Sequence, residues 1–155
     1  MKRASSYAVA AACVIAGAVM ASGQAESAAN ASKAPAPAPG VALDYNFFKT
    51  RVQPVFLQKR PGRTRCYVCH SNNNVAFHVV PLSPGATSWN EEQSRRNFMI
   101  IDQVAQAGNL ESPILKHPLD EKAGGDPHHG GGQQFESQQD PAWQTLRAFV
   151  MGQKG

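Results

Sequence analysis

Two cysteines and a histidine stand together in the segment RCYVCHS, residues 65–71, as Cys66, Cys69 and His70. Cys-x-x-Cys pairs occur as redox-active dithiols, as halves of zinc sites, as local disulfides and, when histidine follows at once, as attachment sites for haem. In the last case the two thiols add to the porphyrin and the imidazole ligates the iron. The elements around the motif decide among these chemistries.

The first three chemistries lack support elsewhere in the sequence. A thioredoxin-like dithiol needs a strand-helix-strand pattern, and no such strands are indicated. A structural zinc site needs four ligands, and its second pair would be the adjacent His128 and His129, whose side chains diverge. A disulfide between Cys66 and Cys69 leaves His70 without a role. Haem attachment uses all three residues, because one helical turn directs both cysteines to the same edge of the ring. The motif therefore predicts one covalently attached haem c.

The N-terminal segment has the features of an export signal. Lys2 and Arg3 precede an apolar run over residues 8–20, which is followed by small residues. This pattern predicts a secretory signal peptide over residues 1–25, with an apolar run too short for a spanning helix. Cys13 lies inside this segment and leaves with it. We therefore expect a periplasmic or otherwise exported protein, in agreement with haem attachment outside the cytoplasm.

Charge is concentrated just before the cysteine motif. The net charge of +4 falls to about +2 once Lys2 and Arg3 are removed, which argues against a nucleic-acid binder. Residues 49–65 contain no acidic residue and six basic ones, namely Lys49, Arg51, Lys59, Arg60, Arg63 and Arg65. Arg63 and Arg65 are candidate contacts for the haem propionates. The local positive charge also suits a redox partner with an acidic surface.

Three helices are predicted in the folded domain, which we place at residues 43–155 after an Ala/Pro-rich linker at 26–42. The first covers residues 45–58, with Asp44 as its N-cap and a kink near Arg51 caused by Pro54. The second covers residues 89–106 and is expected to begin with a capping box formed by Ser88 and Glu91. The last begins at Asp140-Pro141.

Long loops rich in glycine and proline separate these helices, with a short extended run expected at residues 75–80. Loops of this length are unusual in a domain without an organising group, and so few helices predict a small apolar core. The fold class that follows is all-α, with three to four helices and long loops wrapped around one covalently attached haem.

The second axial ligand of the iron has several candidates, which are His78, His117, His128, His129, Met99 and Met151. His78 is too close to His70 in sequence to reach the opposite face with ease, and both methionines are expected to be packing or surface residues. The segment AGGDPHHGGGQQF contains five glycines, which allow a backbone to pass close to a flat ring. His128 or His129 would then reach the iron from the far side.

Three segments of this chain resemble small monohaem c-type cytochrome domains of Acidobacteria and related bacteria. They are YNFFKTRVQPVFLQKRPGRTRCYVCHS, SPILKHPLDEKAGGDPHHGGGQQF and DPAWQTLRAFV, so the resemblance extends from about Tyr45 to Val150. In that group the middle segment reads Ser-x-Leu-Leu-x-His-Pro-Leu, then Gly-Gly, then His-x-Gly-Gly and Phe. The matching positions here are Ser112, His117, Gly124, Gly125, His129, Gly131, Gly132 and Phe135.

The resemblance implies a cytochrome c-like fold and favours His129 as the distal axial ligand, with His117 as the runner-up. The chain departs from the group at Phe149, where a tryptophan is common, and in its doubled histidine at 128 and 129.

The predicted function is one-electron transfer between redox partners, with no enzymatic reaction at a protein side chain. Two histidine ligands predict a low-spin iron with a lower reduction potential than a His/Met pair gives. One alternative is a five-coordinate haem enzyme or ligand sensor. Another is a haem subunit of a larger respiratory complex, which the linker would tether at a membrane.

Overall fold

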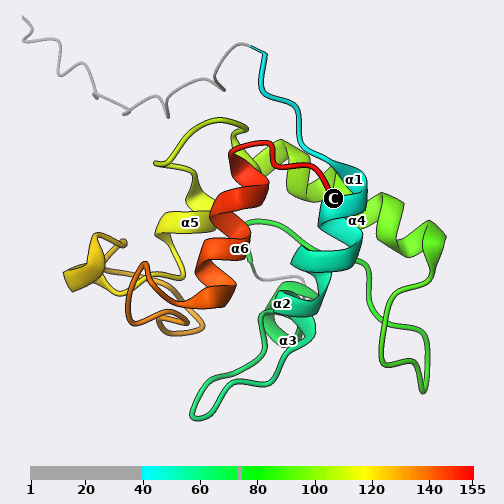
Figure 1. Cartoon of the computed structure of the whole chain (residues 1–155). Helices are drawn as coiled ribbons and strands as arrows, with labels where there is room; N and C mark the ends of the chain where they lie inside the picture. The colour runs from blue at the N-terminus through cyan, green and yellow to red at the C-terminus, as the bar shows by residue number, and fades with distance from the viewer. Residues whose placement is uncertain (1–39, 73–74) are drawn as a thin grey trace, which may run out of the picture. The chain divides into compact units, whose positions relative to one another are not determined.

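Helices and long loops make up the described part of the chain, residues 40–72 and 75–155 of a computed structural model (Figure 1). These residues contain no strand, only an isolated bridge between Leu119 and Phe135, so the all-α prediction is confirmed for them. The extended run expected at residues 75–80 forms no strand. The predicted signal peptide, Cys13 and the linker as far as residue 39 lie outside the described residues. No helix of the described part has the length and apolar character needed to cross a bilayer.

The first helical segment is continuous but changes its winding. It consists of α1 (Tyr45–Phe47), a π-helical turn η1 (Phe48–Val52) and α2 (Gln53–Leu57). The Asp44 carboxylate caps it as predicted, accepting a hydrogen bond from the Phe47 amide at 2.7 Å. The distortion expected near Arg51 takes the form of this π turn, which lies just before Pro54. Its wider winding accommodates a proline, which has no amide hydrogen to donate and whose ring crowds the preceding turn.

The cysteine motif forms α3 (Cys66–His70), a single turn beside α2 (Figure 1). None of its side chains is fully buried, so it depends on contacts with the following loop. The Tyr67 hydroxyl accepts a hydrogen bond from the Leu82 amide at 3.0 Å, and its ring meets Trp89 edge to face. The Val79 amide donates to the His70 carbonyl at 2.7 Å. These contacts fix the turn that carries the motif.

The longest helix, α4 (Glu91–Ala105), begins two residues later than its predicted capping box implies. The capping box is formed by Asn90 and Gln93, whose side chains each accept a hydrogen bond from the other's backbone amide, at 2.9 and 3.0 Å. The prediction of Ser88 and Glu91 was wrong because Asn and Gln fill these two positions as well as Ser and Glu do. Glu91 instead binds Lys49 Nζ at 2.5 Å and the Tyr45 hydroxyl at 3.0 Å.

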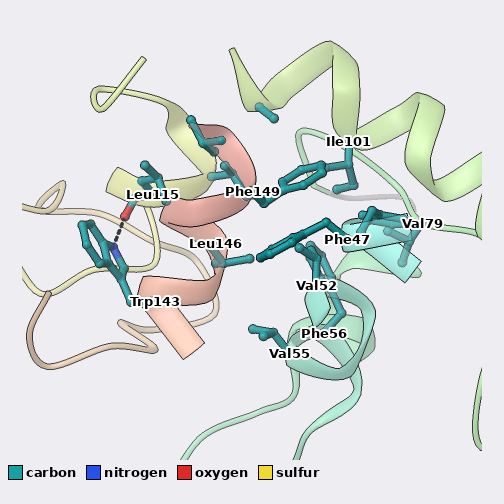
Figure 2. Close-up of a cluster of buried hydrophobic side chains, with 14 of the residues drawn as sticks. Phe47, Val52, Val55, Phe56, Val79, Ile101, Leu115, Trp143, Leu146 and Phe149 are labelled. Atoms are coloured by element: carbon teal, nitrogen blue, oxygen red, sulfur yellow. Dashed lines mark hydrogen bonds between the residues drawn. The ribbon is translucent and has the colours of Figure 1, made fainter. Parts of the chain in front are cut away.

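Three short elements complete the chain, namely α5 (Pro113–Lys116), the 3-10 helix η2 (Glu121–Ala123) and α6 (Pro141–Val150). Asp140 caps α6 as predicted, accepting from the Ala142 amide at 2.8 Å. The Trp143 indole of α6 donates to the Leu115 carbonyl of α5 at 3.1 Å, which ties the two helices together (Figure 2).

The apolar core lies where η1, α2, α4, α5 and α6 meet (Figure 2). The ring of Phe149 is fully buried, with its centroid 5.8 Å from that of Phe48 and 6.4 Å from that of Phe98. Seventeen hydrophobic side chains are buried among the described residues. Because α3 contributes none of them, the cysteine motif lies at the margin of this core.

Replacing Phe149 with alanine tests whether this core carries the stability of the fold. The change leaves a cavity among three aromatic rings, and we expect the free energy of unfolding to fall by about 3 to 5 kcal/mol. Denaturant unfolding measures the loss. Met99→Ala is the control, because the Met99 side chain on α4 is 58% exposed and its loss should change stability by less than about 0.5 kcal/mol. Similar losses in the two variants would contradict the position assigned to the core.

Candidate functional site

The two motif cysteines are free thiols held on one helical turn. Cys66 Sγ lies 4.0 Å from the Val55 carbonyl oxygen, at the side of α3 that faces α2. Cys69 faces a different segment, because a Cβ atom added to Gly131 would lie 3.6 Å from Cys69 Sγ. The glycine-rich loop therefore passes directly beside the motif. No disulfide joins the two cysteines, so both thiols are available for chemistry.

His70, the last residue of α3, is held in one tautomer. Its Nδ1 atom lies 3.2 Å from the Phe77 carbonyl oxygen. A carbonyl oxygen can only accept a hydrogen bond, so Nδ1 carries the proton and Nε2 retains its lone pair. The Phe77 ring also stacks on the imidazole at 4.0 Å between centroids, and Phe56 meets it edge to face. Burial lowers the pKa of His70, which keeps the ring neutral at neutral pH.

His129 lies beside His70 although it belongs to the distant glycine-rich loop. The two ring centroids are 6.4 Å apart and the ring planes differ by 24°. The Nδ1 atom of His129 lies 2.6 Å from the Gly132 carbonyl oxygen, so this ring has the same tautomer as His70. The fold thus brings together two imidazoles whose Nε2 atoms are both free to bind a metal ion.

The glycines of this loop serve different purposes. A Cβ atom on Gly125 would lie 1.9 Å from the Leu119 carbonyl oxygen, so glycine is required there by close packing against the chain's own backbone. Gly124 has a φ of 95°, a conformation that glycine favours. The prediction that the loop glycines face a flat ring therefore does not apply to Gly125. Gly131 is the one of these three that lies next to the cysteine motif.

The other candidates for an axial ligand lie elsewhere. His117 is half exposed, and its Nδ1 atom contacts a carboxylate oxygen of Asp126. His78 and His128 are exposed, and so are Met99 and Met151. The aromatic contacts of the His70 ring are with Phe56, Phe77 and His129. Of the six candidates, the structure places His129 next to His70.

Three of the six basic residues before the motif pair with acidic side chains, namely Lys49, Arg60 and Arg63. Arg63 lies 3.4 Å from a Glu136 carboxylate oxygen, whereas Arg65 is exposed just before α3. Arg60, another of the six basic residues, pairs with Asp140 at the start of α6 and lies 5.0 Å from the centroid of the Phe135 ring. Arg60 and Arg63 also line a pocket of about 430 Å³, which none of the motif residues lines.

Two backbone carbonyls and one glutamine belong to the site but were not found from the sequence. The carbonyls of Phe77 and Gly132 orient the imidazoles, and every residue has a carbonyl, so no residue type signals this role. Gln134 is buried and its side-chain amide donates to the carbonyls of Gly131 and Gly132. Its position two residues after Gly132 and next to Phe135 was the available signal.

Comparison with known proteins adds nothing to this geometry, since no family model, curated protein or solved structure matches the chain. The described residues also contain no group of three or more His, Cys, Asp or Glu side chains placed to hold a metal ion. What the arrangement offers is two thiols and two metal-binding imidazole nitrogens.

The reactivity of Cys66 separates this site from a redox-active dithiol. Burial raises the pKa of the Cys66 thiol to about 11, whereas a catalytic dithiol depends on a thiol whose pKa is lowered. In the reduced chain made without haem, we expect Cys66 to react slowly with iodoacetamide at pH 7.5 and faster as the pH rises toward 11. Mass spectrometry of the labelled peptide gives the rate of alkylation at each pH. A Cys66 thiol that is fully alkylated at pH 7 would contradict the raised pKa assigned to it.

Proposed function

We propose that this chain is an exported c-type cytochrome with one covalently attached haem, which carries single electrons between redox proteins. The observation that carries the proposal is the pairing of His70 with His129. Two imidazoles bound to opposite sides of one metal ion through bonds of about 2 Å have ring centroids roughly 6 Å apart. The 6.4 Å between these two centroids fits that arrangement.

The cysteines fit the same group. Cys66 and Cys69 are free thiols on one turn, and His70 follows directly, as attachment of a haem c requires. A porphyrin brings its own equatorial nitrogens, so the protein needs to add only two axial ligands, in agreement with the lack of a third ligand among the described residues. When bound, the haem supplies reversible one-electron chemistry at its iron.

The residues around the two imidazoles set the conditions for that chemistry. The carbonyls of Phe77 and Gly132 accept the Nδ1 protons of His70 and His129, which fixes each ring and raises the basicity of its Nε2 atom. Phe56 and Phe77 pack against the His70 ring and reduce its exposure to water. Two basic imidazole ligands favour a low-spin iron and a reduction potential below that of a His/Met site.

The charges beside the motif support a protein partner with an acidic surface. In the described part of the chain, Arg51, Lys59 and Arg65 are exposed and take part in no ion pair. Such charges increase the rate of encounter with an acidic partner and are screened by salt. Arg65 also remains a candidate contact for a haem propionate. Arg63 is paired with Glu136, whose carboxylate would compete with a propionate for the Arg63 guanidinium.

The alternatives from the sequence receive less support. A five-coordinate haem enzyme or sensor needs an open distal position, and the placement of His129 beside His70 counts against one. No described residue favours attachment to a larger respiratory complex. Export remains part of the proposal, because haem attachment of this type takes place outside the cytoplasm.

The variant His129→Ala tests the distal ligand in the protein made with a haem-ligation system. We expect the haem to stay attached, while the ferric absorption spectrum changes from low-spin to high-spin and the reduced protein gains rapid binding of carbon monoxide. Loss of the distal imidazole opens that coordination position, which explains both changes.

His117→Ala is the matched control, because His117 is the runner-up histidine and pairs with Asp126 instead of lying beside His70. Its spectrum should equal that of the unmodified chain. A low-spin spectrum that survives His129→Ala but is lost in His117→Ala would transfer the distal role to His117. A chain that acquires no haem at all would refute the proposed function.

A further inference from the structure

The turn that presents His129 is held by a buried glutamine. Gln134 is 4% exposed, and its Nε2 atom lies 3.1 Å from the Gly131 carbonyl oxygen and 3.2 Å from that of Gly132. The Gly132 carbonyl is also the acceptor for Nδ1 of His129, at 2.6 Å. One side-chain amide is therefore linked to the imidazole through a single shared oxygen atom.

The backbone of Gln134 is anchored on the opposite side of this turn. Its amide donates to the Pro118 carbonyl at 2.7 Å, and the Phe135 amide donates to the same oxygen at 3.0 Å. The Asp120 amide in turn donates to the Phe135 carbonyl at 2.8 Å. Gln134 thus connects the His129 turn to the segment that joins α5 and η2, which is itself part of the folded core.

The two polar atoms of the Gln134 side chain have different environments. Oε1 is buried and has no hydrogen-bond partner among the described residues, so the amide acts on this turn only as a donor. Its contact with the turn is donation from Nε2 to the two glycine carbonyls, which an apolar side chain of similar length cannot provide.

We propose that Gln134 is a positioning residue for the distal imidazole, holding the turn at residues 129–132 so that His129 Nε2 stays directed at the metal position. This inference rests on the proposed function. Gln134 does not touch the iron or the haem in this role. It acts through the Gly132 carbonyl, and its loss frees the turn to move His129 away from its ligating position.

The variant Gln134→Met tests the inference in the haem-loaded protein. Methionine matches the length of glutamine but donates no hydrogen bond. We expect the reduced variant to bind carbon monoxide about tenfold faster or more, since removing a group that orients a metal ligand typically weakens ligation by that factor. Stopped-flow absorption gives the rate, and thermal unfolding of the same samples gives the stability, which should remain close to that of the unmodified protein.

Gln138→Met is the matched control. Gln138 lies in the same loop and its amide also donates to a backbone carbonyl, that of Ala123 at 2.9 Å, but it makes no bond to the His129 turn. Its carbon monoxide rate should equal that of the unmodified protein. Gln134→Asn serves as a second variant, which keeps the amide but is too short to reach both glycine carbonyls, and we expect faster binding there as well.

The outcomes separate this inference from the proposed function. A low-spin haem protein in which Gln134→Met and Gln134→Asn bind carbon monoxide at the unmodified rate would overturn the positioning role and leave the cytochrome proposal standing. Equal acceleration in Gln138→Met would also overturn it, because the effect would then belong to the loop in general. A chain without haem would overturn both. Acceleration confined to the Gln134 variants, with stability retained, is the expected result.

Discussion

Two hydrogen bonds from imidazole to backbone carbonyl are the constraint on which the site depends. His70 donates to Phe77 and His129 donates to Gly132, and each bond determines which ring nitrogen remains free. Without these bonds, both rings could rotate or change tautomer, and their Nε2 atoms would not be available together. The rest of the molecule can be understood as the means of holding these two carbonyls and two rings in place.

The fold separates this task from the task of staying folded. The buried aromatic and aliphatic side chains lie between the first helical segment, α4, α5 and α6, and α3 adds none of them. Tyr67 and the Val79 amide tie α3 to the core at its margin, and Gln134 ties down the loop that carries His129. The motif therefore lies at the margin of the core, with both cysteines partly buried and neither in a disulfide.

Much of this organisation could be predicted from the sequence, for reasons that are local. Asp44 and Asp140 are strong N-cap residues, and each caps the helix that it was predicted to begin. The capping box of α4 was misplaced because Ser88 and Asn90 are both acceptable caps, and only the tertiary contacts of Glu91 with Lys49 and Tyr45 decide between them.

The site itself could be predicted only in part. Cys66, Cys69 and His70 are close in sequence, so their placement on one helical turn follows from their spacing. The pairing of His70 with His129 depends on the path of a long loop, and the carbonyls that orient both rings have no signature in any residue type.

The most direct test of the central claim is a nitrogen-15 NMR spectrum of the reduced, haem-loaded protein labelled at its histidines. The account predicts that His70 and His129 each carry one exchange-protected proton on Nδ1 and none on Nε2, with both Nε2 resonances shifted by coordination to one iron. A His129 ring that carries a proton on Nε2, or that titrates with pH like a free imidazole, would contradict it.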